Sequence, residues 1–109
     1  MAGNADIDYA VIEGDFFRFL QSAKVAQCLL LLRNVMTSQV DAISEVCFNI
    51  VRGSEVLENE ELLKVLKRFK HVIRKLSDND LRITERRSII TRHRQTVLKI
   101  IQNAESLLP

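Results

Sequence analysis

Residues that favour turns are scarce in this chain, and this scarcity constrains its fold more than any other feature. The 109 residues include only three glycines and one proline, Pro109. Glycine and proline are the strongest local signals for turns and for breaks in regular structure. The sequence therefore favours helices joined by few connections.

The first half of the chain predicts a strongly apolar helical segment followed by an amphipathic helix. From Asp15, an acceptable N-cap, to Leu32 the sequence is apolar on nearly every side, as one helix or two short ones. We expect such a segment in the middle of a bundle. The next helix has a capping box of Ser38 with Asp41 and ends with Gly53 at the C′ position. Its apolar stripe, at helical spacing, consists of Val40, Ile43, Cys47 and Ile50.

The second half predicts two more helices, which are joined by a turn at residues 77–80. The first begins with Glu58, Glu60 and Glu61, whose carboxylates suit the positive end of the helix dipole. Its apolar stripe consists of Leu62, Leu66, Phe69, Ile73 and Leu76. The last helix runs from about residue 84 to residue 107 and is less apolar in its first half than in its second.

Length and composition set the overall organisation. Hydrophobic residues make up 47% of the chain and charged residues 28%, proportions typical of a globular domain. A chain of 109 residues forms one domain and buries enough surface for a core. We predict an all-α, compact antiparallel bundle of four to five helices over residues 15–109. A flexible acidic N-terminal arm, residues 1–14, is expected to precede this single domain.

Charge is divided unevenly along the chain. Residues 1–63 carry ten acidic and four basic side chains, whereas residues 64–99 carry twelve basic and three acidic ones. The formal net charge of +2 conceals this division. An asymmetry of this size indicates a polyanionic partner or assembly through oppositely charged surfaces.

The basic side chains of the last two predicted helices are the main candidate site. Clusters of Lys and Arg bind phosphates with release of counterions, so their affinity falls steeply with salt. Arginine predominates in the second part of the cluster, which suits bidentate phosphate contacts. The alternative is that these charges form a solvated face or pair with the acidic half of the chain. The predicted nucleic-acid or polyanion surface comprises Lys67, Arg68, Lys70, Arg74, Lys75, Arg82, Arg86, Arg87, Arg92 and Arg94.

The charge division also supports a second function, that of a protein-interaction module. An acidic surface of one copy would then meet a basic surface of another copy or of an adaptor partner, in an association that salt weakens. The residues predicted for this acidic surface are Glu55, Glu58, Glu60 and Glu61.

No residue pattern indicates catalysis, a cofactor or a metal. Cys28, Cys47, His71 and His93 show none of the close pair spacings of zinc ligands, and no nucleophile is marked beside a base. Both cysteines are expected to be buried and reduced, with a disulfide or a reactive thiol as alternatives. We therefore predict that the protein is not an enzyme and uses no cofactor or small-molecule substrate.

Targeting signals are not evident in the sequence. The first residues lack the basic flank and hydrophobic core of a secretory signal. The longest apolar stretch, Cys28–Leu32, is far short of the ~20 residues that a membrane span needs. We expect an intracellular protein without a membrane span, in the nucleus, the cytoplasm or a virion.

A series of residues between Phe16 and Leu98 resembles a known group of proteins. The series consists of Phe19-Leu20, Ala23, Gln27, Leu30-Leu31, Arg33, Gln39, Ala42-Ile43, Glu45, Asn49-Ile50, Gly53, Leu66-Lys67-Arg68, Lys70, Leu76, Ile83 and Arg86-Arg87. It resembles the small helical open reading frames of adenovirus-like mobile elements of the Polinton or adintovirus type. Members of this group often end in a Gly-Gly-Phe-Leu tail, which this sequence does not carry. The resemblance implies a virus- or transposon-derived origin. With the basic cluster, it predicts a non-enzymatic protein that binds nucleic acid, as a structural component of a virus-like particle.

Overall fold

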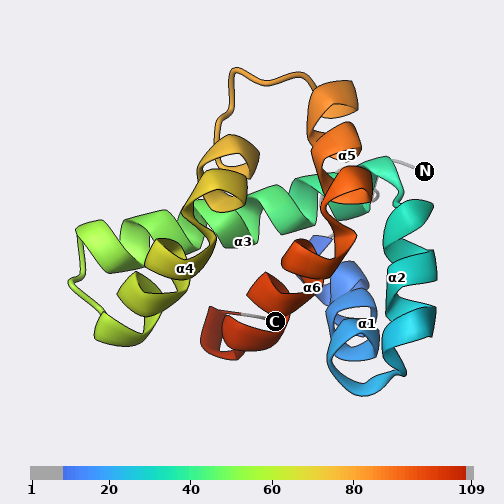
Figure 1. Ribbon diagram of the computed structural model, residues 1–109, viewed down its shortest axis with the longest axis horizontal. Helices are drawn as coiled ribbons and strands as arrows, with labels where there is room; N and C mark the ends of the chain where they lie inside the picture. Colours follow the sequence, from blue (N-terminus) through green and yellow to red (C-terminus); the bar gives the residue numbers. More distant parts are fainter. Residues whose placement is uncertain (1–8, 108–109) are drawn as a thin grey trace.

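The chain folds into six α-helices and one short 3-10 turn within the residues that the structure describes (Figure 1). A computed structural model describes residues 9–107, and their side chains from residue 14 onward except that of residue 106. The elements are α1 (Tyr9–Ser22), α2 (Val25–Arg33), α3 (Thr37–Glu55), α4 (Glu60–Leu76), α5 (Ile83–Arg92), α6 (Arg94–Asn103) and the turn η2 (Glu105–Leu107). The all-α prediction is confirmed. The radius of gyration, 13.5 Å, lies close to the ~13 Å expected for a compact domain of this length.

Helix α3 has the most extensive packing in the described structure, and three of the other helices lie against it. It contacts α1, α4, α5 and η2, and its contact with α4 is the most extensive in the molecule. Helix α6 contacts α1, α2, α4 and α5 and closes the core from another side. In Figure 1, α5 crosses α3 steeply rather than running alongside it. The predicted antiparallel arrangement is therefore not confirmed.

The two amphipathic stripes predicted from the sequence form the core around α3 and α4. All four stripe residues of α3 are buried, and so are four of the five on α4, with Phe69 half-buried. Phe69 also has non-helical dihedral angles (φ −120°, ψ 25°), which kink α4. Glu60 and Glu61 occupy the first turn of α4, as predicted, whereas Glu58 precedes the N-cap Asn59 and is not part of the helix.

The predicted number of helices is wrong because the last predicted helix is broken at His93. This residue has φ −111° and ψ 38°, and it ends α5 and precedes α6. Backbone hydrogen bonds continue on both sides of the break, since the His93 N–H donates to Ile89 and the His93 carbonyl accepts from Val97. Ile90 before the break and Ile101 after it are both fully buried.

Two predicted helix starts also differ from the structure. Helix α1 begins at Tyr9 rather than at Asp15, and the first eight residues of the predicted arm lie outside the described residues. The N-cap of α3 is Met36, whose N–H donates to Oε1 of Gln39 at 2.8 Å. The predicted capping box that starts at Ser38 is therefore wrong.

Gly53 does not end α3, because the helix continues to Glu55. The left-handed residue of the turn into α4 is Glu58, with φ 52°, and the Asn59 N–H reaches back to the Gly53 carbonyl at 3.1 Å. A Cβ atom built on Gly53 would lie 2.3 Å from Cδ1 of Leu62 in α4. The predicted C′ role is wrong. The absence of a side chain at Gly53 leaves room for the buried tip of the Leu62 side chain, which packs against this point of α3.

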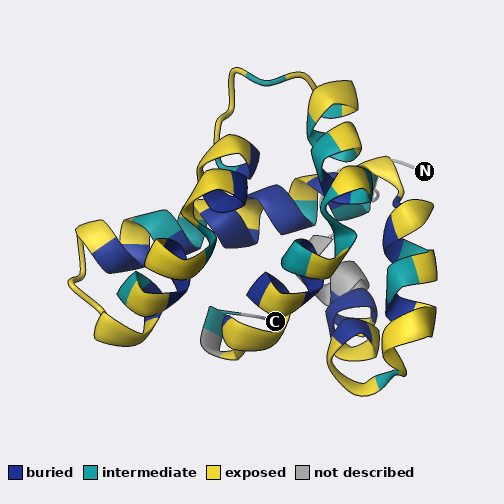
Figure 2. Cartoon of the chain, viewed as in Figure 1, coloured by how far each residue is buried: buried dark blue, intermediate teal, exposed yellow. Residues whose placement is uncertain are grey.

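Helix α2 lies at the edge of the fold, although its sequence is apolar on nearly every side. Its buried residues are Cys28 and Leu32, whereas Val25 and Leu30 are exposed. Figure 2 shows exposed and half-buried residues over much of this helix. The prediction that the segment from Asp15 to Leu32 occupies the middle of the bundle is wrong for α2, whereas Phe16, Phe17 and Leu20 of α1 are buried in the core.

Candidate polyanion-binding surface

The ten predicted cations fall into two groups in the structure. Five lie on α4, and the other five lie between the N-cap of α5 and the first residue of α6. All five on α4 are exposed, as are Arg82 and Arg92, whereas Arg86, Arg87 and Arg94 are half-buried. The two groups therefore have different surroundings.

Arg86 joins α5 to α3. Its Nη1 donates to Oδ1 of Asp41 at 3.3 Å and to Oγ of Ser44, a buried residue, at 3.0 Å. The Arg86 side chain is only 15% exposed, and its Nε is buried with no hydrogen-bond partner among the described atoms. This guanidinium is held against α3 and is not presented to a phosphate.

Arg87 ties α5 to the connection between α2 and α3. Its Nε donates to the Val35 carbonyl at 3.3 Å, and its Nη2 donates to Oγ1 of Thr37. Because Arg86 and Arg87 both serve contacts between helices, we remove them from the proposed binding surface. The partners of Arg86 and Arg87 lie 42 to 52 residues away in sequence, so no local pattern reveals them.

Arg92 and Arg94 bond only to their own segment of chain in the described structure. Arg92 donates to the Ser88 hydroxyl at 3.2 Å, and Arg94 donates to the Thr91 carbonyl next to the break at His93. The Arg92 contact lies within α5, and the Arg94 contact joins α6 to α5 only across the break between them. Arg92 remains exposed.

The exposed basic residues of α4 form a surface that we name the basic face. It consists of Lys64, Lys67, Arg68, Lys70, His71 and Lys75, all of them exposed. None of these side chains forms a salt bridge within the described part of the chain, and Arg68 lies over the Phe69 ring at 5.0 Å. Lys64 and His71 are absent from the predicted set. Their spacing of three and four residues from Lys67 is the signal that places them on this face.

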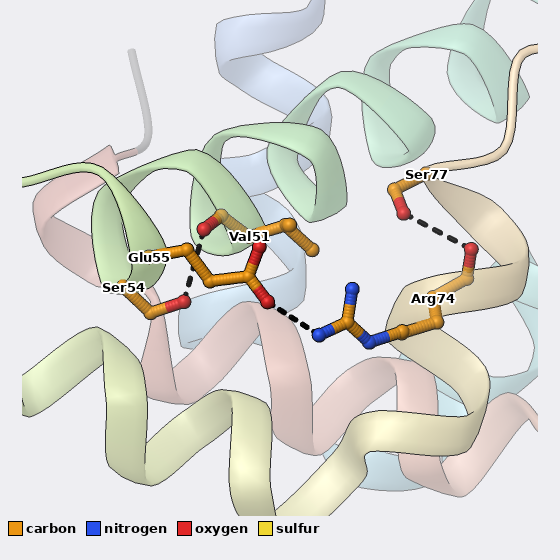
Figure 3. Close-up of polar contacts among 5 residues, drawn as sticks. All are labelled: Val51, Ser54, Glu55, Arg74 and Ser77. Carbon is orange, nitrogen blue, oxygen red and sulfur yellow. Dashed lines mark hydrogen bonds and ion pairs between the residues drawn. The ribbon is translucent and has the colours of Figure 1, made fainter.

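Arg74 on the same helix pairs with Glu55 at the end of α3 (Figure 3). Both side chains are about half exposed, at 46% and 48%, so the pair contributes little to stability. At this point the acidic and basic halves of the chain meet within one molecule, as the alternative interpretation of the charges predicts.

Two shallow hollows lie beside the basic face. The first, of about 430 Å³, is lined by Lys70, His71, Arg74, Lys75 and Asp78. The second, of about 580 Å³, lies between α4 and α5 and has both Lys75 and Arg92 on its walls, with Asp78 and Glu85. The first hollow is the more favourable for an anion, because four of its five lining side chains are basic.

No protein-family model, curated protein or solved structure matches this chain. Its function must therefore be inferred from the chemistry of its surface.

Metal ligands do not converge in the described structure. No three His, Cys, Asp or Glu side chains of the described residues lie close enough together to hold a metal ion. Among the described helices, none combines the length and apolar content required to cross a lipid bilayer.

Both cysteines are buried and free, as predicted. The Cys28 sulfur lies 3.6 Å from the carbonyl oxygen of Leu20, at the C-terminal end of α1. Burial raises the pKa of the Cys28 thiol and raises the pKa of the Cys47 thiol from 9.0 to about 12. The thiolate is the reactive form of cysteine, so neither residue is suited to nucleophilic chemistry.

Native protein should therefore leave both thiols unmodified by Ellman's reagent at pH 8. Both should react at once in denaturant, because unfolding exposes the thiols and restores their ordinary pKa. The measurement is the release of the coloured thiolate with and without guanidinium chloride. Rapid release of one equivalent from folded protein would contradict the burial of that cysteine, and single Cys→Ala variants would identify which one it is.

Proposed function

We propose that this protein binds nucleic acid, or another polyanion with closely spaced phosphates, through the basic face of α4. The observation that carries the proposal is an exposed helix surface of a single sign of charge. No acidic residue occurs between Lys64 and Lys75, and the side chains of the basic face are exposed without ionic partners among the described residues.

The spacing of these like charges lowers the stability of α4 in the absence of a bound anion. Lys64, Lys67 and Lys70 follow one another at three residues, and Lys70 and Arg74 are four apart. Like charges at these spacings destabilise a helix by about 0.2–0.5 kcal/mol per pair. Solvated surfaces more often intersperse both signs of charge. A bound polyanion would relieve this repulsion between like charges. We would not expect so many like charges on a face that is merely solvated.

The chemistry of the basic face indicates contacts to the phosphate backbone rather than to bases. The face offers Lys and Arg side chains, and Phe69, the aromatic residue among them, is half-buried beneath Arg68. Phosphate contacts position a protein on nucleic acid without reading its sequence, and stacking on bases needs exposed aromatic side chains. We infer sequence-independent binding, as suits a virus- or transposon-derived protein that packages nucleic acid.

Fluorescence anisotropy with labelled DNA duplex and labelled RNA, over a series of salt concentrations, tests this function. We expect log affinity to fall linearly with log salt. The triple variant Lys67→Gln, Lys70→Gln and Lys75→Gln should bind roughly 10- to 100-fold more weakly at low salt. Its salt slope should be smaller by about 2 to 3, because each phosphate contact contributes about one.

A second triple variant provides the matched control. Lys24→Gln, Arg33→Gln and Arg52→Gln remove the same charge from exposed positions outside α4, and we expect less than about a threefold change. Equal losses of affinity in the two triple variants would show that net charge alone governs binding. No binding by the unchanged protein at ~50 mM salt would reject the proposed function.

A second candidate function, protein–protein interaction, rests on a different surface. The turn between α3 and α4 carries acidic and apolar side chains, all of them exposed. We name this surface the acidic tip, and it consists of Glu55, Val56, Leu57, Glu58, Glu60 and Glu61. It contains every residue predicted for the acidic interaction surface.

A further inference from the structure

The acidic tip carries the two most exposed large apolar side chains of the described structure. Val56 is 69% exposed and Leu57 is 72% exposed. They lie among four glutamates, of which Glu55 is paired with Arg74 and the other three have no salt bridge within the described residues. No basic residue occurs between Arg52 and Lys64. The acidic tip therefore presents exposed apolar side chains that are surrounded by acidic ones.

Helix α2 and its exit offer a second exposed apolar surface. Val25 is 59% exposed, Leu30 is 62% and Met36 is 63%. We name this surface the α2 face, and it consists of Val25, Ala26, Leu30 and Met36. Ala26 and Leu30 are one helical turn apart, so they lie on the same side of the helix. Adjoining exposed apolar residues are typical of an interaction site, and Ala26 and Leu30 are the adjoining pair of this face.

The surroundings of the α2 face are basic. The exposed side chains Lys24 and Arg33 lie at the two ends of helix α2, and no acidic residue occurs from residue 16 to residue 40. The two apolar surfaces thus have charges of opposite sign around them. Complementary charge favours this pairing and disfavours tip-to-tip or α2-to-α2 contacts, in which like charges would meet.

The two surfaces cannot meet within one molecule. The turn between α3 and α4 and helix α2 lie at opposite ends of the long dimension in Figure 1, and that dimension is 42 Å. We propose that the acidic tip of one copy docks on the α2 face of a second copy. Such a contact is heterologous: every assembly keeps one unused acidic tip at one end and one unused α2 face at the other, so the chain of copies grows head to tail. This inference does not depend on the basic face of α4.

Sedimentation velocity of nucleic-acid-free protein, over a series of concentrations at low salt, tests the proposal. Because the contact is small, we expect weak association, with the average mass rising up to about 1 mM and passing that of a dimer. Leu57→Asp and Leu30→Asp should each keep the protein monomeric, since each places a charge in one surface. Phe48→Asp is the matched control, because Phe48 is an exposed apolar residue of α3 outside both surfaces, and it should associate like the unchanged protein.

Mixing the two monomeric variants distinguishes the tip-to-α2 contact from tip-to-tip and α2-to-α2 contacts, and growth of the unchanged protein beyond a dimer distinguishes an open chain from a closed pair that makes the contact twice. The Leu30→Asp variant keeps its tip and the Leu57→Asp variant keeps its α2 face, so an equimolar mixture should form a dimer and nothing larger. A monomeric mixture would reject the pairing, and self-association by Leu57→Asp alone would show α2-to-α2 contact instead. A monomer at all concentrations of the unchanged protein would overturn the proposal. Circular dichroism of each variant establishes that it is folded.

Discussion

Replacing Gly53 by alanine should destabilise the protein by about 1–2 kcal/mol, although alanine is the better helix former. In an exposed helix interior the same change stabilises by about 1 kcal/mol. At Gly53 the new Cβ would lie 2.3 Å from Cδ1 of Leu62, and Leu62 is buried in the contact between α3 and α4. Relieving that overlap requires the leucine to leave its position or the two helices to separate. Denaturant unfolding of the variant measures the loss.

A double-mutant cycle isolates this one contact. In a Leu62→Ala background the obstruction is gone, so adding Gly53→Ala should stabilise the protein instead of destabilising it. Gly14→Ala is the matched control: Gly14 lies within α1, and no described atom lies within 4 Å of a Cβ built there. That variant should gain up to about 1 kcal/mol. A stabilising Gly53→Ala in the unchanged background would show that the Leu62 side chain moves aside without loss of packing.

The role of Gly53 shows why helix ends are hard to predict from a single sequence. Glycine serves both as a C′ residue and as a site of close helix approach, and the local sequence is the same in either case. Leu62, which lies nine residues further on and across a turn, determines which of these two roles Gly53 has. The left-handed position itself falls on Glu58, a residue that no propensity favours there.

Helical periodicity predicted the two helices whose apolar stripes are narrow, and it failed for α2. On α3 and α4 one side of each helix is apolar, so the pattern determines which side is buried. On α2 the apolar residues surround the helix, so the pattern does not determine an orientation. Val25 and Leu30 are left exposed. The break at His93 could not be predicted from the sequence either. It contains neither glycine nor proline, and backbone hydrogen bonds continue on both sides of it.

The candidate site was predicted in part for a related reason. Composition located the basic cluster, and helical spacing placed Lys67 and Lys70 on one exposed face. The same reasoning counted Arg86 and Arg87 as exposed, because charged residues are mostly exposed unless they are paired. Their partners come from the connection before α3 and from its first turns. Tertiary packing alone brings these groups together.

Replacing both Arg86 and Arg87 by glutamine should destabilise the protein by about 2 kcal/mol and leave its salt-dependent binding slope unchanged. Arg86 leaves behind the buried hydroxyl of Ser44, and a buried group that loses its partner costs about 1–3 kcal/mol. The contact with Asp41 adds little, because that carboxylate is 61% exposed and screened by water. Unfolding in denaturant and anisotropy titrations, on the same preparations, measure the two quantities.

Arg82→Gln with Arg92→Gln is the control for this prediction. Both side chains are exposed and make no hydrogen bond to another helix among the described residues, so stability should change by no more than about 0.5 kcal/mol. The comparison separates two kinds of arginine that look alike in the sequence. If the Arg86 and Arg87 variant loses nucleic-acid affinity at unchanged stability, α5 belongs to the binding surface and its contacts to α3 open when the polyanion binds. If it loses stability alone, the basic face is confined to α4, and Arg86 and Arg87 serve to hold the helix bundle together.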